Sequence, residues 1–275
     1  KMIPILLTTV TTLCAITQSH STKQPDQCTF ALNQKPSATN GSKSTMSFRT
    51  IKKIIPQQPR HWVGNAFNVF PAFGPSSFTQ ELSPWLMFDY AAPKTFKPTK
   101  TRRGVGKHPH RGFETITIAY QGAVEHHDSV GNRGVIGPGD VQWMTAGRGV
   151  IHEEYHSREF GSTGGVFEMC QLWLNLPQRY KMHAPRYQSI VGKDVPVVEV
   201  GDGGRVRVIA GSFGGATGPA LTFSEVELWD LVVDGAGGVV ELDVPEGHNV
   251  HVFVRKGNVT IEGEELGHQS LALLN

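Results

Sequence analysis

The sequence predicts an all-β protein whose strands close into a barrel or stack as a sandwich. Gly occurs 31 times and Pro 17 times among the 275 residues, which is typical of short strands joined by tight turns. Short apolar and β-branched runs recur at close intervals along the chain. No long helical period interrupts them, so we expect little helix.

The predicted strands fall into two groups. In the first group, strong turn signals separate the strands at Gly131-Asn132 and at Gly137-Pro138-Gly139-Asp140, because Gly permits positive φ while Pro and Asp favour turn geometry. The strands of this group cover residues 115–120, 122–126, 140–144 and 166–176. The second group covers residues 205–209, 220–226, 230–233, 239–242 and 250–254. We therefore expect two β units, bounded at 46–195 and 196–275.

Both ends of the chain depart from this pattern. Residues 1–45 begin with an apolar, Thr-rich run at 3–16 and continue with a stretch rich in Ser, Thr, Lys and Gln. The run is too short to span a bilayer, so we interpret residues 1–45 as a leader that is disordered or acts in targeting. At the other end, the apolar run 271–274 is followed only by Asn275, and we expect the second unit to be incomplete.

Charge and cysteine content narrow the function classes. A formal net charge of +2 gives no global reason to expect nucleic acid or a membrane as partner. Cys14, Cys28 and Cys170 are too scattered for a disulfide framework, so we expect reduced thiols. One local feature is basic: the acid-free stretch formed by Lys94, Lys97, Lys100, Arg102, Arg103 and Lys107. It is a candidate anion contact or an ordinary solvated loop, and the solvated loop is favoured.

Histidine is concentrated in one part of the chain. Twelve histidines are present, and half of them lie between His108 and His156. Residues i and i+2 of a strand share a face, so His108 and His110 point the same way, as do His152 and Glu154. Two such strands facing each other can surround one ion. Three imidazoles and one carboxylate suit a borderline divalent metal such as iron, nickel, cobalt, manganese or zinc.

Spacing alone leaves this ligand set open. A His-x-His pair also arises by chance in a chain with this many histidines. Glu114 has the strand parity of His108 and His110, and His156 has the parity of His152 and Glu154. The adjacent pair at 126–127 faces opposite sides of a strand, and we interpret it as a surface pair. The histidines at 248 and 251 show neither strand parity nor a second cluster.

The sequence around these histidines resembles the pirin family. The segments 108–115 (HPHRGFET) and 137–152 (GPGDVQWMTAGRGVIH) are similar to the two signature stretches of pirins. The likeness continues through 171–177 (QLWLNLP) and 184–188 (APRYQ), and covers about residues 48 to 275. Residues 1–45 lie outside it.

The resemblance implies a bicupin, which is a pair of cupin (double-stranded β-helix, or jelly-roll) barrels. The first, at 46–195, would bind the metal, and the second, at 196–275, would lack strands with which pirins continue. The resemblance also implies the ligands His108, His110, His152 and Glu154 around one divalent ion, with Fe(II) favoured. In that case Glu114 is not a metal ligand but a residue that orients one of the imidazoles.

Two functions follow from the resemblance. The first is a quercetin 2,3-dioxygenase-like reaction on a flavonol and dioxygen, with Glu154 as ligand and base. Phe113, Trp143 and Met144 could line the substrate pocket, although the hydrophobic core is the favoured place for each. The second function is that of an iron-dependent transcriptional co-regulator with a transcription-factor partner, and a metal-stabilised protein without turnover is a third possibility.

The predicted partners and compartment follow from the same resemblance and composition. We expect a monomer that contacts neither nucleic acid nor a membrane directly. The expected compartment is the cytoplasm, and also the nucleus, unless residues 1–45 direct the chain to an organelle.

Overall fold

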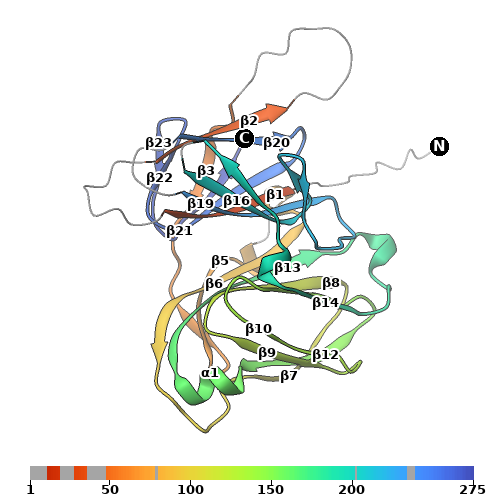
Figure 1. Ribbon diagram of the computed structural model, residues 1–275. Coiled ribbons are helices and arrows are strands. Elements are labelled where there is room, and N and C mark those ends of the chain that lie inside the picture. The colour runs from red at the N-terminus through yellow and green to blue at the C-terminus, as the bar shows by residue number, and fades with distance from the viewer. Residues whose placement is uncertain (1–10, 19–27, 36–47, 78–79, 202, 234–238) are drawn as a thin grey trace, which may run out of the picture. The chain divides into compact units, whose positions relative to one another are not determined.

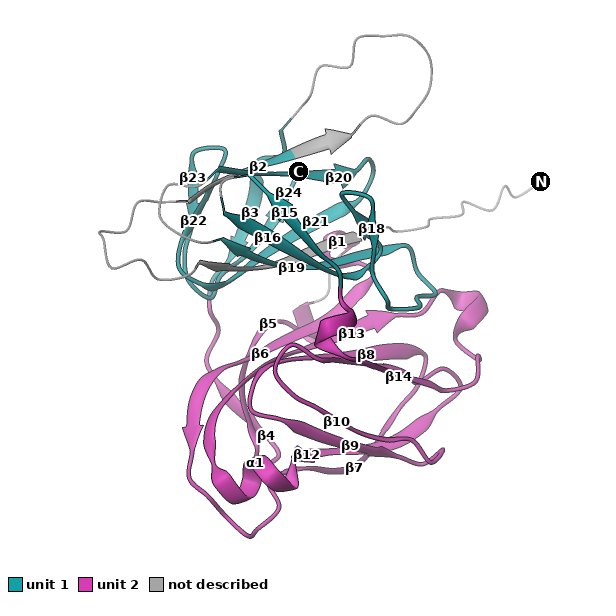
Figure 2. Cartoon of the chain, viewed as in Figure 1, with its two compact units in different colours: residues 1–56, 196–275 teal, residues 57–195 magenta. Residues whose placement is uncertain are grey.

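The structure of the chain, a computed structural model, describes residues 11–18, 28–35, 48–77, 80–201, 203–233 and 239–275 (Figure 1). The chain divides into two compact units, one of residues 57–195 and one of residues 1–56 together with 196–275 (Figure 2). Among the described residues, strands make up nearly all of the regular secondary structure of both units, so the predicted all-β fold class is confirmed.

The unit of residues 57–195 contains two antiparallel sheets. Its strands are β4 (His61–Val63), β5 (Phe67–Phe73), β6 (Trp85–Phe96), β7 (Gly104–His110), β8 (Phe113–Gln121), β9 (Val124–Asp128), β10 (Arg133–Ile136), β11 (Val141–Thr145), β12 (Val150–His156), β13 (Gly165–Asn175) and β14 (Arg186–Ile190). The helical turns are α1 (Arg158–Thr163), η1 (Pro75–Ser77), η2 (Gln80–Leu82), η3 (Gln178–Tyr180) and η4 (Gly192–Asp194).

The two sheets of this unit face each other and enclose a core. The larger sheet has the order β14-β11-β8-β13-β6-β5-β4 and the smaller one the order β10-β9-β12-β7. Figure 1 shows the smaller sheet opposite β8 and β14. Along β9 and β12, every second residue is buried and the residues between are more exposed, which is the alternation of a sheet with one face inward. The inward positions of β9 and β12 therefore decide what the barrel contains.

Two of the predicted turn signals have a clear physical role. At the first, Gly131 has a φ of 95° and the chain reverses between β9 and β10. At the second, Gly139 has a φ of 90°, and the Asp140 carboxylate accepts hydrogen bonds from the backbone N–H of Gly137 at 2.9 Å and of Gly192 at 2.7 Å. The carboxylate thus ties the β10–β11 turn to the segment after β14.

The other unit also contains two main sheets and a short hairpin. Its strands are β1 (Thr11–Gln18), β2 (Cys28–Lys35), β3 (Ile51–Ile55), β15 (Val197–Val200), β16 (Gly204–Ala210), β17 (Ser212–Phe213), β18 (Ala216–Thr217), β19 (Val226–Val233), β20 (Val239–Pro245), β21 (Asn249–Lys256), β22 (Val259–Ile261), β23 (Glu264–Leu266) and β24 (Leu271–Leu274). The sheet orders are β15-β16-β19-β1-β21-β24-β3 and β20-β2-β22-β23, with β17 paired to β18. The core between the sheets is rich in Val and Leu.

The apolar run at 271–274 finds its partners earlier in the chain. It forms β24, which pairs antiparallel with β21 on one side and with β3 on the other. Leu271 is fully buried, and Arg49 donates a hydrogen bond from Nη1 to the Asn275 carbonyl at 2.7 Å. Residues 51–55 therefore belong to this unit, whereas the sequence assigned them to the first domain. The predicted incompleteness of the second unit stays a prediction.

Two strands lie within the segment interpreted as a leader. The strand β1 pairs in parallel with β19 and β21, and β2 pairs in parallel with β20 and β22. The sequence did not predict these pairings. Residues 1–10, 19–27 and 36–47 lie outside the described residues, and the targeting role of 1–45 stays a prediction.

Candidate metal centre

Two neighbouring strands of the smaller sheet bring three histidines to one point. β7 carries His108 and His110, β12 carries His152, and the antiparallel register sets His152 directly opposite His108. The ring centroid of His152 lies 4.3 Å from that of His108 and 4.7 Å from that of His110. One ligand nitrogen from each ring lies within 4.8 Å of the other two, so the three could hold one ion.

The pairing of β7 with β12 contains a bulge at this point. His152 pairs with His108, but Glu154 pairs with Val105, so two residues of β7 lie opposite one residue of β12. Gly106 is one of the two, and its carbonyl lies 2.8 Å from Nδ1 of His108. A proton on that Nδ1 leaves Nε2 of His108 free for a metal.

Burial favours the uncharged form of the inner histidines. His110 and His152 are buried, and His108 is half-buried. Burial, helped by the neighbouring imidazoles, lowers the pKa of His110 and that of His152 to about 3. Both rings are therefore neutral at neutral pH, and neutral imidazole is the form that binds a metal.

An unsatisfied buried atom also fits a metal. Nε2 of His152 is buried and makes no hydrogen bond within the part of the chain that the structure describes. Leaving such an atom without a partner is costly, since a buried polar group loses its hydration without compensation. A metal ion at this position would satisfy it, and the donor set of imidazole nitrogens and a carboxylate fits a divalent transition ion.

Glu154 lies beside the three histidines. Its carboxylate forms a second group of possible ligands with His152 and His126. Among the described residues, the hydrogen bonds to its Oε1 are long, at 3.4 Å from Nε2 of Gln142 and at 3.5 Å from Oγ1 of Thr117. Burial raises the pKa of Glu154, while His126 and His108 act in the opposite direction. The Oε1 atom is therefore weakly hydrogen-bonded, and the carboxylate lies within ligand distance of His152, which also belongs to the group of three histidines.

Glu114 has a different environment. It is fully buried on β8, and its Oε1 accepts a hydrogen bond of 2.6 Å from Oγ1 of Thr145. Burial raises its pKa to about 7. Alternation along β8 puts Glu114 on the face opposite to Thr117, whose hydroxyl faces Glu154. The predicted role of Glu114 in orienting an imidazole stays a prediction.

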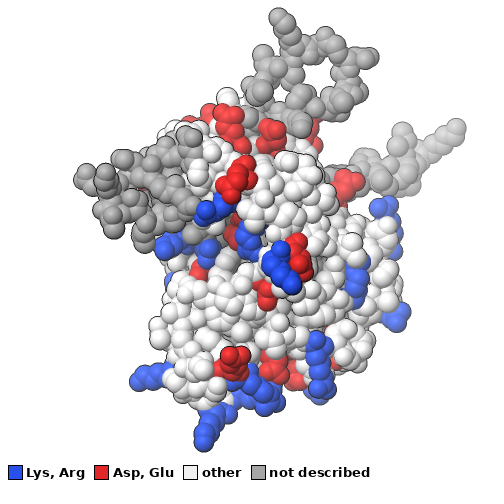
Figure 3. Space-filling view, in the orientation of Figure 1, with Lys and Arg blue, Asp and Glu red and all other residues white. Residues whose placement is uncertain are grey.

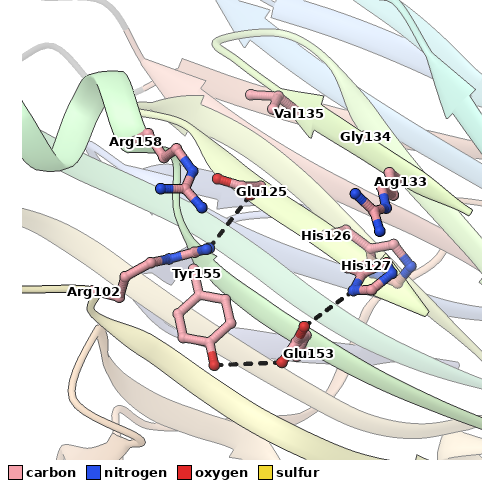
Figure 4. Close-up of a pocket in the computed structure, with 10 residues that line it drawn as sticks. All are labelled: Arg102, Glu125, His126, His127, Arg133, Gly134, Val135, Glu153, Tyr155 and Arg158. Carbon is pink, nitrogen blue, oxygen red and sulfur yellow. Dashed lines mark hydrogen bonds and ion pairs between the residues drawn. The ribbon is translucent and has the colours of Figure 1, made fainter. Parts of the chain in front are cut away.

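His126 lies inside the barrel, which corrects the expectation of a surface pair. It is buried, whereas its neighbour His127 is half-buried and lies 3.1 Å from Glu153 on the other face of the sheet (Figure 4). Nδ1 of His126 is 3.3 Å from Nδ1 of His152. A signal was present in the sequence: Val124 has the same strand parity as His126 and marks the inward face of β9.

His156, the other rival ligand on β12, lies away from these groups. It is buried among aromatic rings, with ring centroids 4.5 Å from Phe167, 4.7 Å from Phe96 and 5.0 Å from Phe160. Burial is the main cause that lowers its pKa to about 4, with Arg103 adding to the effect. It belongs to neither group of possible metal ligands found among the described residues.

Known proteins match the chain over most of its length. Residues 66–174 match the family model described as Pirin. A Pseudomonas aeruginosa protein named "Putative quercetin 2,3-dioxygenase" is 52% identical over 217 residues, which are 78% of this chain and 76% of that protein. A "Pirin-like protein" of Caulobacter vibrioides is 37% identical over 218 residues, again 78% and 76%. The chain belongs to the pirin family.

A solved structure extends the likeness to three dimensions. The crystal structure of quercetin 2,3-dioxygenase from Acinetobacter baumannii is 47% identical and matches with a TM-score of 0.77. The match covers 82% of this chain and 79% of that one. The pirin resemblance seen in the sequence motifs is therefore confirmed, and the cupin fold with it.

Two aromatic residues of this pirin flank the histidines. The ring centroid of Phe113 lies 5.1 Å from His110 and 4.7 Å from Trp173, and Trp173 lies 5.3 Å from His110. Both aromatic side chains are half-buried. The sequence had singled out Phe113 but missed Trp173. Trp143 and Met144 are almost completely buried, which fits the core role favoured for them.

The basic stretch before the metal motif lines a pocket. Lys100, Arg102 and Arg103 join Arg158 around a cavity of about 620 Å³. Figure 3 shows Lys and Arg side chains gathered at the lower edge of the face in view. Arg102 lies 3.4 Å from Glu125 and its guanidinium is 4.0 Å from the Tyr155 ring centre (Figure 4). Whether this surface contacts an anion stays a prediction.

Two further predictions concern thiols and membranes. Cys170 is a buried thiol, as expected, and the side chains of the other two cysteines lie outside the described residues. None of the helices in the described ranges is both long and apolar enough to cross a bilayer.

Proposed function

We propose that this pirin binds one divalent metal ion through His108, His110, His152 and Glu154 and uses it to open the ring of a flavonol with dioxygen. The observation that carries the proposal is the convergence of three imidazoles on one point beside a weakly engaged carboxylate. The relatives named for quercetin 2,3-dioxygenase support the choice of reaction. The products would be carbon monoxide and the ring-opened ester.

The ligand set favours a borderline metal. We propose Fe(II), with nickel, cobalt, manganese and zinc as ions that the same three nitrogens and one oxygen could bind. When bound, such an ion supplies a Lewis acid that lowers the pKa of the flavonol hydroxyl and holds the flavonol next to dioxygen.

Glu154 would take the hydroxyl proton on Oε1. Its burial raises its pKa, so the carboxylate gains a proton more readily than an exposed one. Thr117, 3.5 Å from this oxygen, makes a shorter hydrogen bond of 2.7 Å to Oε1 of Gln171, and Gln142 is 3.4 Å away, so the Glu154 oxygen is only weakly hydrogen-bonded. Phe113 and Trp173 offer aromatic faces next to His110, where a flat aromatic substrate could pack.

Metal content is the first test. We expect about one divalent ion per chain in the wild type and a large loss in His110→Ala, with His127→Ala as the control because His127 faces away from the site. Elemental analysis of folded proteins measures this. Equal metal in the wild type and His110→Ala would refute the proposed ligands.

Turnover is the second test. Iron, nickel, cobalt and manganese forms of the folded protein are incubated with quercetin and dioxygen, and flavonol loss and carbon monoxide release are measured together. We expect release of carbon monoxide in at least one form. Metal-loaded protein that releases none in any form would remove the dioxygenase proposal while leaving the metal site intact.

The co-regulator role remains a prediction. Among the described residues, no observation favours a transcription-factor partner over a small substrate. The cellular compartment and the monomeric state likewise stay predictions from the resemblance.

A further inference from the structure

We infer that Asp128, His126 and His152 form a hydrogen-bonded chain that fixes which nitrogen of His152 faces the ion. His126 is then a positioning residue of the centre and does not itself bind the metal. The inference rests on the proposed metal site and adds to it three features that the sequence motif does not contain: a second histidine, a carboxylate and a turn.

The two nitrogens of the His152 ring have different surroundings. Nδ1 lies 3.3 Å from Nδ1 of His126, and Nε2 is buried without a hydrogen bond to any described residue. A neutral imidazole has one donor and one acceptor nitrogen, so a proton on Nδ1 leaves the Nε2 lone pair for an ion. His108 shows the same arrangement, since its Nδ1 faces the Gly106 carbonyl at 2.8 Å.

Nδ1 of His126 can accept a hydrogen bond from the Nδ1–H of His152, because the other nitrogen of the His126 ring, Nε2, has a partner of its own. Nε2 of His126 lies 3.5 Å from Oδ2 of Asp128, a long hydrogen bond. A proton on Nε2 leaves Nδ1 as the acceptor that faces His152. The His126 ring also stacks on Tyr187, with centroids 4.8 Å apart and an angle of 20° between the planes. The stacking holds the ring in the plane that the two hydrogen bonds require.

Asp128 ends the chain at a rigid turn. Its Oδ1 accepts hydrogen bonds from the backbone N–H of Val130 at 3.0 Å and of Asn132 at 2.9 Å. Its Oδ2 accepts a third, of 2.8 Å, from the side-chain amide of Asn132. These residues form the turn between β9 and β10, so the backbone itself fixes the carboxylate. Carboxylates that orient metal-binding histidines in this way commonly raise metal affinity 10- to 100-fold.

A competing role for His126 is that of a ligand. His126, His152 and Glu154 also have ligand atoms within 4.8 Å of one another, and two nitrogens bound to one ion are separated by about 3 Å. The positioning role is favoured because it gives His152 and His108 the same arrangement, with Nδ1 bonded to the protein and Nε2 left free. The ligand role is an outcome that overturns the inference.

The first experiment needs no metal. Long-range ¹H–¹⁵N spectra of the metal-free protein report which nitrogen of His152 carries the proton. We expect it on Nδ1 in the wild type and in the control His127→Ala, and displaced towards Nε2 in His126→Ala. A wild-type proton on Nε2, or the same tautomer in His126→Ala, overturns the inference.

The second experiment measures affinity for Zn(II) and Co(II) by competition with a chromogenic chelator. His126→Ala should weaken binding by about 10- to 100-fold. His126→Asn should recover most of it, because its amide oxygen can occupy the place of Nδ1, and His127→Ala should stay within about twofold. Adding Asp128→Asn to His126→Ala should cause no further loss of metal affinity, since both residues act through the same hydrogen-bonded chain to His152.

The outcomes separate the two proposals. Wild-type affinity in His126→Ala, additive losses in the double variant, or a Co(II) spectrum that shows one fewer ligand in His126→Ala would each overturn the positioning role. A wild type that binds neither ion refutes the proposed metal site, and the tautomer spectra then still decide whether the hydrogen-bonded chain exists.

Discussion

His152 and His156 lie four residues apart on the same face of β12, yet their surroundings differ completely. Both are buried. His152 is surrounded by polar groups, with two imidazoles from β7 and one from β9. His156 is surrounded by the rings of Phe96, Phe160 and Phe167. One strand thus carries both a candidate ligand and a core histidine.

The difference shows that strand parity identifies the face but not the chemistry. Parity places both rings inside the barrel. Their chemical roles depend on the residues that neighbouring elements place around each ring. These are histidines around His152 and phenylalanines around His156.

The largest expected effect is on the metal. His152→Ala should lose metal affinity by more than about a hundredfold, because the ligand itself is removed and not merely its orientation. His156→Phe, at the matched position of the same strand, should keep wild-type affinity. Chelator competition measures both. Equal losses of metal affinity in the two variants would mean that His152 and His156 do not differ in their relation to the metal.

The next effect concerns catalysis. Glu154→Gln should lower kcat for flavonol turnover by about a hundredfold or more, since the amide cannot accept the hydroxyl proton. Metal content is measured in the same samples, so that the turnover rate of each protein is expressed per bound ion. Turnover per ion equal to that of the wild type would show that Glu154 is not the base.

Acid stability should depend on His156. Its pKa is about 4 in the folded protein and near 6.5 in the unfolded chain, so the unfolded chain binds the proton more tightly. The stability gained from the neutral ring is complete above pH 6.5 and is lost as the pH falls towards 4, by up to about 3 kcal/mol. His156→Phe should flatten this part of the curve in chemical denaturation at fixed pH values. An unchanged slope between pH 6.5 and 4 would contradict the predicted cause.

The smallest effect is expected at the aromatic edge of the centre. Trp173→Ala should raise the KM for a flavonol by about tenfold, the loss of one packed aromatic face, without changing metal affinity. Steady-state kinetics beside the metal titration separate the two quantities. A change in metal affinity with constant KM would place Trp173 in support of His110 instead of against the substrate.

Much of the site could be predicted from the sequence. The spacing of His108 and His110, and of His152 and Glu154, correctly placed each pair on one face of its strand. Spacing did not separate Glu154 from Glu114 or His156, because parity is equal for all of them. The flanking pirin motifs made that choice, and the structure puts Glu154 beside His152 while His156 lies among aromatic rings.

The parts that the sequence missed depend on distant partners. The inward position of His126 required the alternation of β9 to be traced from Val124, but the adjacent His127 obscured it. Trp173 reaches the centre because β13 pairs with β8, which no local pattern encodes. The strand β1 pairs in parallel with β19, and β2 pairs in parallel with β20, so each pairing joins residues more than 200 positions apart in the chain. Short strands carry no signal for such distant partners.

The bulge in β7 has a consequence for the length of that strand. Val105 and His108 are three residues apart, yet they pair with Glu154 and His152, which are two apart. A deletion of Gly106 would restore a regular ladder and would suit the sheet, but it would remove the carbonyl that holds the His108 ring. The same glycine therefore interrupts the regular ladder and supplies the carbonyl beside His108, so a deletion here is expected to weaken the proposed metal binding more than the folding of the sheet.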